Sequence, residues 1–194
     1  MNAIPYVMQN NHQIVSDIYS SLLENRIIFL DGEINNQCAS LIISQLLYLE
    51  SKDSNEDIQL YINSTGGSVS DGLAIIDTMN TISCDVSCIV TGMAASMAAL
   101  ILSSGTKGKR YALPHAEIMI HQPMSMTQGQ VSDLKIAVHH VQQVKETLCD
   151  LLVELTGQKK EKIHKDMDRD KWFNAKDAKS YGLIDAILKK DKLF

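Results

Sequence analysis

The stretch Thr91-Gly92-Met93-Ala94-Ala95-Ser96-Met97 sets one hydroxyl group among small side chains. Residues 85–90, just before it, are rich in β-branched side chains, which predicts a buried strand, and Gly92 predicts a tight turn into a helix that begins near Ser96. A serine at such a bend has an exposed Oγ beside helix-start N–H groups that can stabilise negative charge. The stretch therefore fits a nucleophile, although small residues also serve close packing of a helix on a sheet.

Segments on both sides of this bend alternate between strand and helix patterns. Strands are predicted over residues 26–30, 58–62 and 85–90, with a helix after each. Residues 58–62 are almost continuously apolar, which is typical of a central strand in a covered, parallel sheet. The alternation predicts one α/β domain, residues 1–194, of stacked βαβ units with right-handed crossovers. The first helix is predicted to have Asn36 as its cap and an apolar face of Cys38, Leu41, Ile42, Gln45, Leu46 and Leu49.

The second half of the chain contains shorter strands and one long helix. Strands are predicted over residues 110–113, 117–120 and 183–188, with a short helix from an Asn174 cap to Gly182 before the last of them. Apolar side chains at spacings of three and four predict a helix over residues 131–155, about 37 Å long. Such a helix either projects and packs against a second copy or serves as a core helix, and periodicity alone fits both.

Composition excludes several classes of function. The chain has 194 residues and a formal net charge of -5, with acidic and basic residues interspersed, so no basic face for nucleic acid or for a membrane surface is expected. Residues 1–5 do not begin a signal peptide, and the longest apolar run, residues 97–102, is too short to span a bilayer. We expect a soluble, cytoplasmic protein with no metal and no cofactor. Its four cysteines, expected to be reduced and buried, are Cys38, Cys84, Cys88 and Cys149.

Two further features follow predicted strands, where open α/β sheets build their sites. Gly66 and Gly67 come directly after the central strand, and a glycine pair can turn its N–H groups toward a ligand, although most such pairs are only turns. The N–H groups of Gly67 and Met97 could together form an oxyanion hole. His121 ends the strand over residues 117–120 and could act as a general base toward Ser96, although a single histidine is more commonly a surface or core residue.

Three longer motifs give the chain a clear resemblance. T-G-M-A-A-S-M at residues 91–97, K-G-K-R-Y-A-L-P-H-A-E-I-M-I-H-Q-P at residues 107–123 and Y-I-N-S-T-G-G at residues 61–67 resemble the proteolytic subunits of the Clp protease family. Shorter similarities lie at residues 17–20, 128–130 and 181–185, and the Ser-to-His spacing of 25 residues agrees with the family pattern. The family's catalytic aspartate falls on Asp170, which composition could not have selected from the charged run around it.

The resemblance implies a crotonase-like fold and a specific assembly. Residues 122–156 would be a protruding handle region and residues 1–20 an N-terminal axial segment. Two stacked seven-membered rings would enclose a chamber into which an AAA+ unfoldase threads unfolded polypeptides, so that the peptidase itself needs no ATP. In this scheme the catalytic residues are Ser96, His121 and Asp170, the oxyanion hole is formed by Gly67 and Met97, and the ring-ring contacts come from Arg169, Asp168 and Gln130.

The sequence departs from the family pattern at several positions. Thr65 replaces the usual proline of the N-S-P-G-G turn, which leaves that loop less restricted and predicts lower activity. Residues 124–126, Met-Ser-Met, are bulkier than the usual glycines, residues 11–15 lack the usual basic stretch, and Thr81 stands where an aromatic residue commonly lines the unfoldase-docking pocket. We therefore expect a divergent paralogue, in rings of its own or in mixed rings with a paralogous subunit.

Two other functions compete with this interpretation. Crotonase-type acyl-CoA hydratases and isomerases use the same βαβ unit and two backbone amides to hold an enolate, but they need no serine nucleophile. An inactive structural subunit of a mixed protease ring is the non-enzymatic alternative. The presence of all three triad residue types argues against an inactive subunit. Alignment of these side chains is the observation that distinguishes an active peptidase from an inactive subunit.

Overall fold

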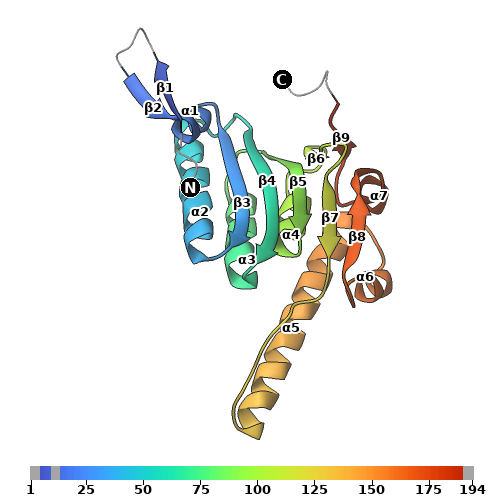
Figure 1. Cartoon of the computed structure of the whole chain (residues 1–194). Helices are drawn as coiled ribbons and strands as arrows, with labels where there is room; N and C mark the ends of the chain where they lie inside the picture. The colour runs from blue at the N-terminus through green and yellow to red at the C-terminus, as the bar shows by residue number, and fades with distance from the viewer. Residues whose placement is uncertain (1–4, 10–13, 190–194) are drawn as a thin grey trace.

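A seven-stranded sheet organises the chain, and the computed structural model describes residues 5–9 and 14–189 of it (Figure 1). Residues 1–4 and 10–13, which include much of the predicted axial segment and of the divergent stretch at 11–15, lie outside the described residues. The strands are β1 (Tyr6–Gln9), β2 (Ile14–Asp17), β3 (Ile27–Ile34), β4 (Ile58–Gly67), β5 (Val86–Ala95), β6 (Arg110–Ala112), β7 (Glu117–Ile120), β8 (Lys171–Asn174) and β9 (Ala186–Ile187). The helices are α1 (Ile18–Glu24), α2 (Asn36–Lys52), α3 (Val69–Thr81), α4 (Met97–Ser103), α5 (Val131–Thr156), α6 (Lys160–Asp166) and α7 (Ala175–Tyr181).

The large sheet is parallel along its main path and forks at β5. Its order is β3-β4-β5-β6-β9, and all of these neighbours run parallel. The first part of β5 pairs with β6 and the last part, residues 93–95, pairs with β7. Strand β8 then adds to β7 in antiparallel orientation. The fork brings the end of β5 beside the end of β7.

Helices α2, α3 and α4 pack against one face of β3, β4 and β5 and bury the main core (Figure 1). All seven residues of α4 are buried, so this helix is enclosed on every side. The alternation of strands and helices in this half of the chain agrees with the predicted stacked βαβ units. The core contains three of the four cysteines, and burial raises the pKa of the Cys88 thiol to about 12.

Helix α5 projects from the body, as Figure 1 shows. Its buried residues, Leu148, Cys149 and Leu152, lie in its C-terminal half, whereas Ile136 and Val138 near its start are exposed. Of the two interpretations that periodicity left open, the structure supports the projecting helix over the core helix. None of the helices in the described part of the chain combines the length and apolar character needed to cross a lipid bilayer.

Several predicted boundaries were wrong. The N-cap of α2 is Asn35, whose side chain accepts from the Cys38 N–H, and not Asn36. Leu41 is exposed, since the buried face of α2 is narrower than the predicted one. The last strand covers only residues 186–187, because Asp185 pairs with Arg110 and the residues before it form a turn after α7. Helices α1 and α6, strand β8 and the β1–β2 hairpin were not predicted, and β5 continues through the predicted turn at Gly92 to Ala95.

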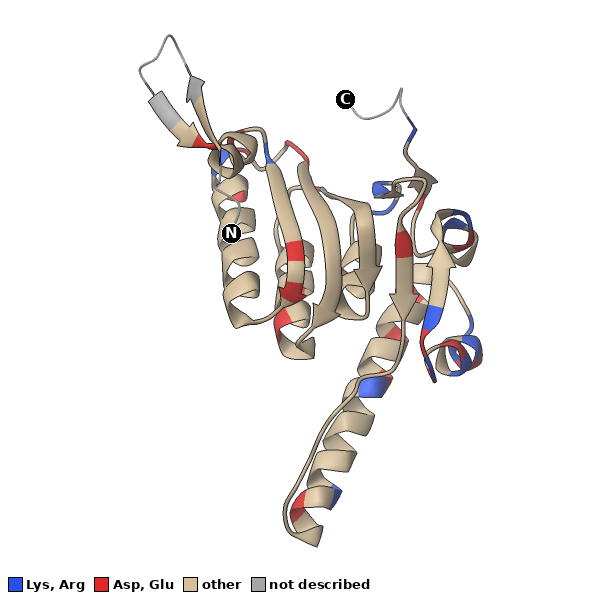
Figure 2. Cartoon of the chain, in the orientation of Figure 1, with Lys and Arg blue, Asp and Glu red and all other residues tan. Residues whose placement is uncertain are grey.

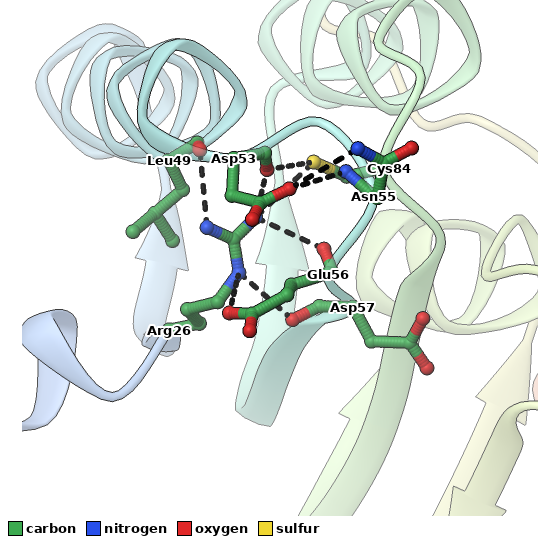
Figure 3. A network of polar contacts seen from close by, with 7 residues as sticks. All are labelled: Arg26, Leu49, Asp53, Asn55, Glu56, Asp57 and Cys84. Carbon is green, nitrogen blue, oxygen red and sulfur yellow. Dashed lines mark hydrogen bonds and ion pairs between the residues drawn. The ribbon is translucent and has the colours of Figure 1, made fainter.

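Figure 2 shows acidic and basic residues interspersed over the chain, with a mixed group on α6, α7 and β8. Arg26, one of two arginines that are almost wholly buried in the described part of the chain, lies at the junction of α1 and β3 (Figure 3). Its guanidinium donates to the main-chain carbonyls of Leu49, Asp53, Glu56 and Asp57 and to Cys84 Sγ. The single side chain therefore joins the end of α2, the loop before β4 and the segment between α3 and β5.

Replacing Arg26 with lysine should destabilise the protein. Lysine has no planar fork and cannot reach four carbonyls in different directions, so Arg26→Lys leaves buried acceptors unpaired and should lower the free energy of unfolding by about 2 to 3 kcal/mol. Denaturant unfolding followed by circular dichroism measures the change. The matched control is Glu56→Gln, which removes only a 4.0 Å ion pair to an exposed carboxylate and should cost less than about 0.5 kcal/mol. Equal losses for the two variants would contradict the prediction.

Candidate active site

The backbone of Ser96 adopts a conformation that few residues other than glycine accept. Its φ is 56° and its ψ is -124°, at the junction between β5 and the first residue of α4. A serine in this position commonly caps the helix, but the Ser96 side chain makes no capping hydrogen bond. The backbone N–H of Ser96 donates to the Met119 carbonyl at 2.9 Å, which ties the bend to β7. The hydroxyl is therefore turned away from the helix and is available for other partners.

The structure brings the three predicted catalytic side chains into one chain of hydrogen bonds. Ser96 Oγ lies 2.9 Å from His121 Nε2, and His121 Nδ1 lies 3.0 Å from Asp170 Oδ1. His121 follows the last residue of β7 and Asp170 precedes the first residue of β8, and these two strands pair with Ile120 opposite Lys171. The imidazole is mostly buried, whereas the Asp170 side chain is 60% exposed. The geometry permits a proton to pass from the hydroxyl to an imidazole that a carboxylate orients.

The predicted oxyanion donors lie at the same place. Met97 is the first residue of α4, a position whose N–H has no acceptor within the helix. Gly67 lines the cavity that also contains Ser96 and His121. Gly66, which precedes it with φ of 88°, approaches so closely that an added Cβ would lie 2.7 Å from Ser96 Cβ and 3.0 Å from the Met97 nitrogen. Gly66 thus fits tightly beside the bend, and Gly67 fits as tightly against the backbone of Ile34 on β3.

The cavity at the site has a volume of about 260 Å³. Two of the residues at which the sequence departs from the family pattern, Thr65 and Met124, line it, and the Met124 side chain is largely exposed. A carboxylate that the sequence did not single out, Glu33, also lines it. The full lining is Glu33, Thr65, Gly66, Gly67, Val69, Ser96, His121, Pro123 and Met124.

The predicted ring-contact residues are not gathered together within one chain. Arg169 and Asp168 lie on the exposed loop before β8, where Arg169 Nη1 donates to the Asp168 carbonyl at 2.8 Å. Gln130 precedes α5 at its outer end, and no hydrogen bond or ion pair in the described structure joins it to either residue. Thr81 ends α3 as an exposed residue, with its hydroxyl donating to the Asp77 carbonyl. Within the described ranges, no group of three His, Cys, Asp or Glu side chains could hold a metal ion.

Comparison with known proteins agrees with this geometry. Residues 10–191 match the Clp protease family. The chain is also 50% identical over 194 residues to the ATP-dependent Clp protease proteolytic subunit of Ligilactobacillus salivarius (strain UCC118). The alignment covers 99% of this chain and 98% of that protein. The chain belongs to the Clp protease family. Its parallel sheet with flanking helices is the crotonase-like fold that the resemblance implied for a Clp protease chain.

A polar cluster that the sequence analysis missed supports the start of β8 in this Clp protease chain. The Asp166 carboxylate, 10% exposed, accepts hydrogen bonds from Lys162, Lys171 and Tyr181 at 2.8, 2.5 and 2.8 Å. Burial opposes ionisation of Asp166, but the three hydrogen bonds outweigh burial and lower its pKa to about 2. Burial and the bond to Asp166 raise the pKa of Tyr181. Lys171, the residue after Asp170, is therefore held by its ion pair with Asp166.

Gly66→Ala should inactivate the site without unfolding the protein. The new Cβ would lie 2.5 Å from the Ala95 carbonyl oxygen, so the glycine turn or the Ser96 bend must move, and misplacing an oxyanion donor costs about 100- to 1000-fold in kcat. Cleavage of a short fluorogenic peptide measures the loss. Gly157→Ala is the matched control, because Gly157 also has a positive φ but nothing lies within 4 Å of an added Cβ. Unchanged kcat in Gly66→Ala would contradict the close approach.

Asp166→Asn should produce a pH-dependent loss of stability. Because the pKa of Asp166 is lower in the folded chain than in the unfolded one, its ionised form stabilises the fold above about pH 4, and this contribution is lost as the pH falls toward 2. The variant should lose about 1 to 2 kcal/mol at pH 7, and its difference from wild type should shrink below pH 4. Denaturant unfolding at several pH values measures this difference. Asp150→Asn, which removes an exposed ion pair to Lys160, should cost less than about 0.5 kcal/mol, and a pH-independent difference for Asp166→Asn would refute the assignment.

Proposed function

We propose that this chain is the serine endopeptidase subunit of an ATP-dependent Clp protease and cleaves peptide bonds through Ser96, His121 and Asp170. The observation that carries the proposal is the pair of contacts at 2.9 and 3.0 Å that joins hydroxyl, imidazole and carboxylate in order. Membership of the Clp protease family supports the same chemistry. Unfolded polypeptide is the proposed substrate, and the peptidase step itself uses no ATP.

The reaction begins when Ser96 Oγ attacks the scissile carbonyl carbon and its proton passes to His121 Nε2. The carbonyl electrons move to the oxygen, and the N–H groups of Gly67 and Met97 stabilise the resulting oxyanion. Collapse of this intermediate expels the amine, which takes the proton from the imidazolium, and an acyl group remains on Ser96. Water then attacks the acyl-enzyme with His121 as base, which releases the acid and restores the hydroxyl. Asp170 holds the imidazole in the tautomer that these steps need.

Assembly of the subunit follows from the projecting helix. The exposed apolar side chains near the start of α5, among them Val131, Ile136 and Val138, need a partner surface, and a second copy of the helix supplies one. We propose that residues 122–156 join two stacked seven-membered rings, with Gln130, Asp168 and Arg169 at their contact. We propose that the rings contain this chain alone or this chain with a paralogous subunit. Each chain forms a single domain over residues 1–194, and an AAA+ unfoldase is the proposed partner of the rings.

The alternative functions leave the site unexplained. An acyl-CoA hydratase or isomerase would use the two backbone amides but would give the Ser96–His121 contact no purpose. An inactive structural subunit would have no need of a serine held at a positive φ, which is a conformation that costs free energy. The aligned side chains therefore favour the peptidase over both.

Ser96→Ala should abolish hydrolysis. Loss of the nucleophile of a serine protease costs about 10⁶-fold in kcat, so cleavage of a fluorogenic peptide should fall to background, and a fluorophosphonate should label wild type on Ser96 but not the variant. Ser180→Ala, which removes an exposed hydroxyl on α7, is the control and should keep wild-type activity. Native mass determination of the same samples reports the size of the assembly.

The outcomes separate the three functions. Labelling of Ser96 with peptide cleavage supports the peptidase. Cleavage that survives in Ser96→Ala removes the proposed nucleophile. Wild-type protein that neither reacts nor cleaves, alone or mixed with a paralogous subunit, would establish the structural role, and hydration or isomerisation of an acyl-CoA without fluorophosphonate labelling would establish the crotonase-type activity.

A further inference from the structure

Of the residues that the structure describes, Glu33 is the one carboxylate that lines the cavity beside Ser96. No lysine or arginine belongs to this described lining, and its other side chain that can carry a charge is the imidazole of His121. The imidazole is already paired with Ser96 and Asp170, at 2.9 and 3.0 Å. A substrate that enters the cavity therefore meets the negative charge of Glu33 next to the groups that react.

The backbone of β3 fixes the position of Glu33. The pairing of β3 with β4 shifts its register after Asp31 and then places Glu33 opposite Gly66, whose close approach to Ser96 is described above. The next residue, Ile34, is fully buried in the core. Because successive side chains of a strand point to opposite faces, Glu33 points away from that core. The carboxylate is thus carried by the strand that lies directly beside the glycine turn of the site.

The Glu33 carboxylate has no partner among the described residues. Its side chain is exposed, and no hydrogen bond or ion pair joins it to another residue in the described ranges. Asp31, two residues earlier on the same strand, differs because it lines a separate groove with Tyr19 and Phe29. A cationic group of a ligand can therefore bind Glu33 by displacing water alone, with no bond inside the protein to break.

The other walls of the cavity suit the side chain of lysine or arginine. Val69, Pro123 and Met124 supply apolar surface near the carboxylate of Glu33. Lysine and arginine have a matching construction, because each packs an aliphatic stem on apolar surface while its charged end stays with a polar partner. The bond from an ammonium or guanidinium group to a carboxylate is charge-assisted and stronger than a neutral hydrogen bond. An acidic side chain of the substrate would instead place a second negative charge beside Glu33.

We propose that Glu33 is a specificity-determining residue of the peptidase. Its carboxylate binds the charged end of a substrate lysine or arginine that lies within two residues of the scissile bond, and it disfavours an acidic residue at that position. The range of two residues follows from the position of Glu33 opposite Gly66, next to the proposed oxyanion donor Gly67. The inference rests on the proposed peptidase function and names the class of substrate that the site prefers, which is unfolded polypeptide with basic residues beside the cut.

The test uses internally quenched peptides that share one sequence and differ at a single position. Each of the two positions before and the two positions after the scissile bond carries lysine, glutamine or glutamate in turn, and mass spectrometry of the products verifies the bond that is cut. The ratio of kcat/KM between two such peptides measures specificity, and a general loss of activity in a variant cancels from this ratio. Fluorophosphonate labelling of Ser96 and native mass are measured on the same samples.

Three variants of the full chain are compared with wild type. Glu33→Gln removes the charge and keeps the size of the side chain, and Glu33→Lys reverses the charge. Glu117→Gln is the matched control, because it makes the same change at an exposed glutamate of β7 that does not line the cavity. This control separates a local contact at Glu33 from a general attraction between basic peptides and a negatively charged chain.

Wild type should prefer lysine over glutamine by about 10-fold in kcat/KM at one or more of the four positions, the effect of one charge-assisted bond, and should disfavour glutamate there. Glu33→Gln should bring both ratios close to one, and Glu33→Lys should prefer the glutamate peptide. Glu117→Gln should keep the wild-type ratios. Raising the salt concentration from about 0.05 to about 0.5 M should reduce the lysine preference of wild type, because the contact is open to solvent.

Several results would overturn the inference. Wild type that cleaves the peptides with no preference for lysine at any of the four positions would show that Glu33 does not select substrates. A lysine preference that persists in Glu33→Gln, or that falls equally in Glu117→Gln, would assign the preference to other groups. Loss of all cleavage in both Glu33 variants, with normal labelling and mass, would make Glu33 a residue needed for turnover and not for selection.

Failure of the proposed function has a different signature. Wild-type protein that neither labels at Ser96 nor cleaves any of the peptides would remove the peptidase function and this inference together. A wild type that labels and cleaves, but with ratios that the Glu33 variants do not change, removes the inference alone.

Discussion

The site depends on the backbone of Ser96, which is held at φ of 56° between a strand and a buried helix. A non-glycine residue in such a conformation costs roughly 1 to 3 kcal/mol, and it persists only where its surroundings leave no alternative. Those surroundings are the pairing of residues 93–95 with β7, the bond from the Ser96 N–H to the Met119 carbonyl and the complete burial of α4. The same pairing determines where β7 ends, and His121 follows directly. Ser96 and His121 are therefore placed by one pair of strands.

The aspartate is placed by a weaker kind of constraint. Asp170 stands on the short connection between α6 and β8, and its side chain is 60% exposed. Its position depends on polar bonds that cross between elements, from Gln122 on one side and from the Asp166–Lys171 pair on the other. Polar bonds at a surface are individually modest and can be exchanged for water. Ser96 and His121 thus stand at the ends of paired strands of the sheet, while Asp170 is held by polar bonds at the surface.

The difference between these constraints decides what could be predicted from the sequence. Ser96 and His121 follow apolar runs that predict strands, so local pattern was enough to place both at strand ends. Asp170 lies in a run of charges with no periodicity, and only the resemblance to a family selected it. The bond between Gln122 and Lys145 joins residues 23 apart and depends on the angle at which α5 leaves the body, which no local pattern specifies. The prediction that Leu41 belongs to the buried face of its helix was wrong for a related reason. Helical spacing identifies the apolar face of a helix but does not specify how much of that face the sheet covers.

The substitution of threonine for proline at position 65 can be judged against the contacts around it. Proline would restrict φ at this position, and its absence increases the freedom of the unfolded chain more than it alters the folded turn. In the folded turn the buried Ser64 hydroxyl donates to the Gly32 carbonyl and accepts from the Gly66 N–H at 3.1 Å, so side-chain bonds fix the turn on both sides of Thr65. Gly66 is also held by close contact with residues 95–97. Ser64 and the Ser96 bend therefore set the position of Gly66, so that the expected cost of Thr65 falls on stability.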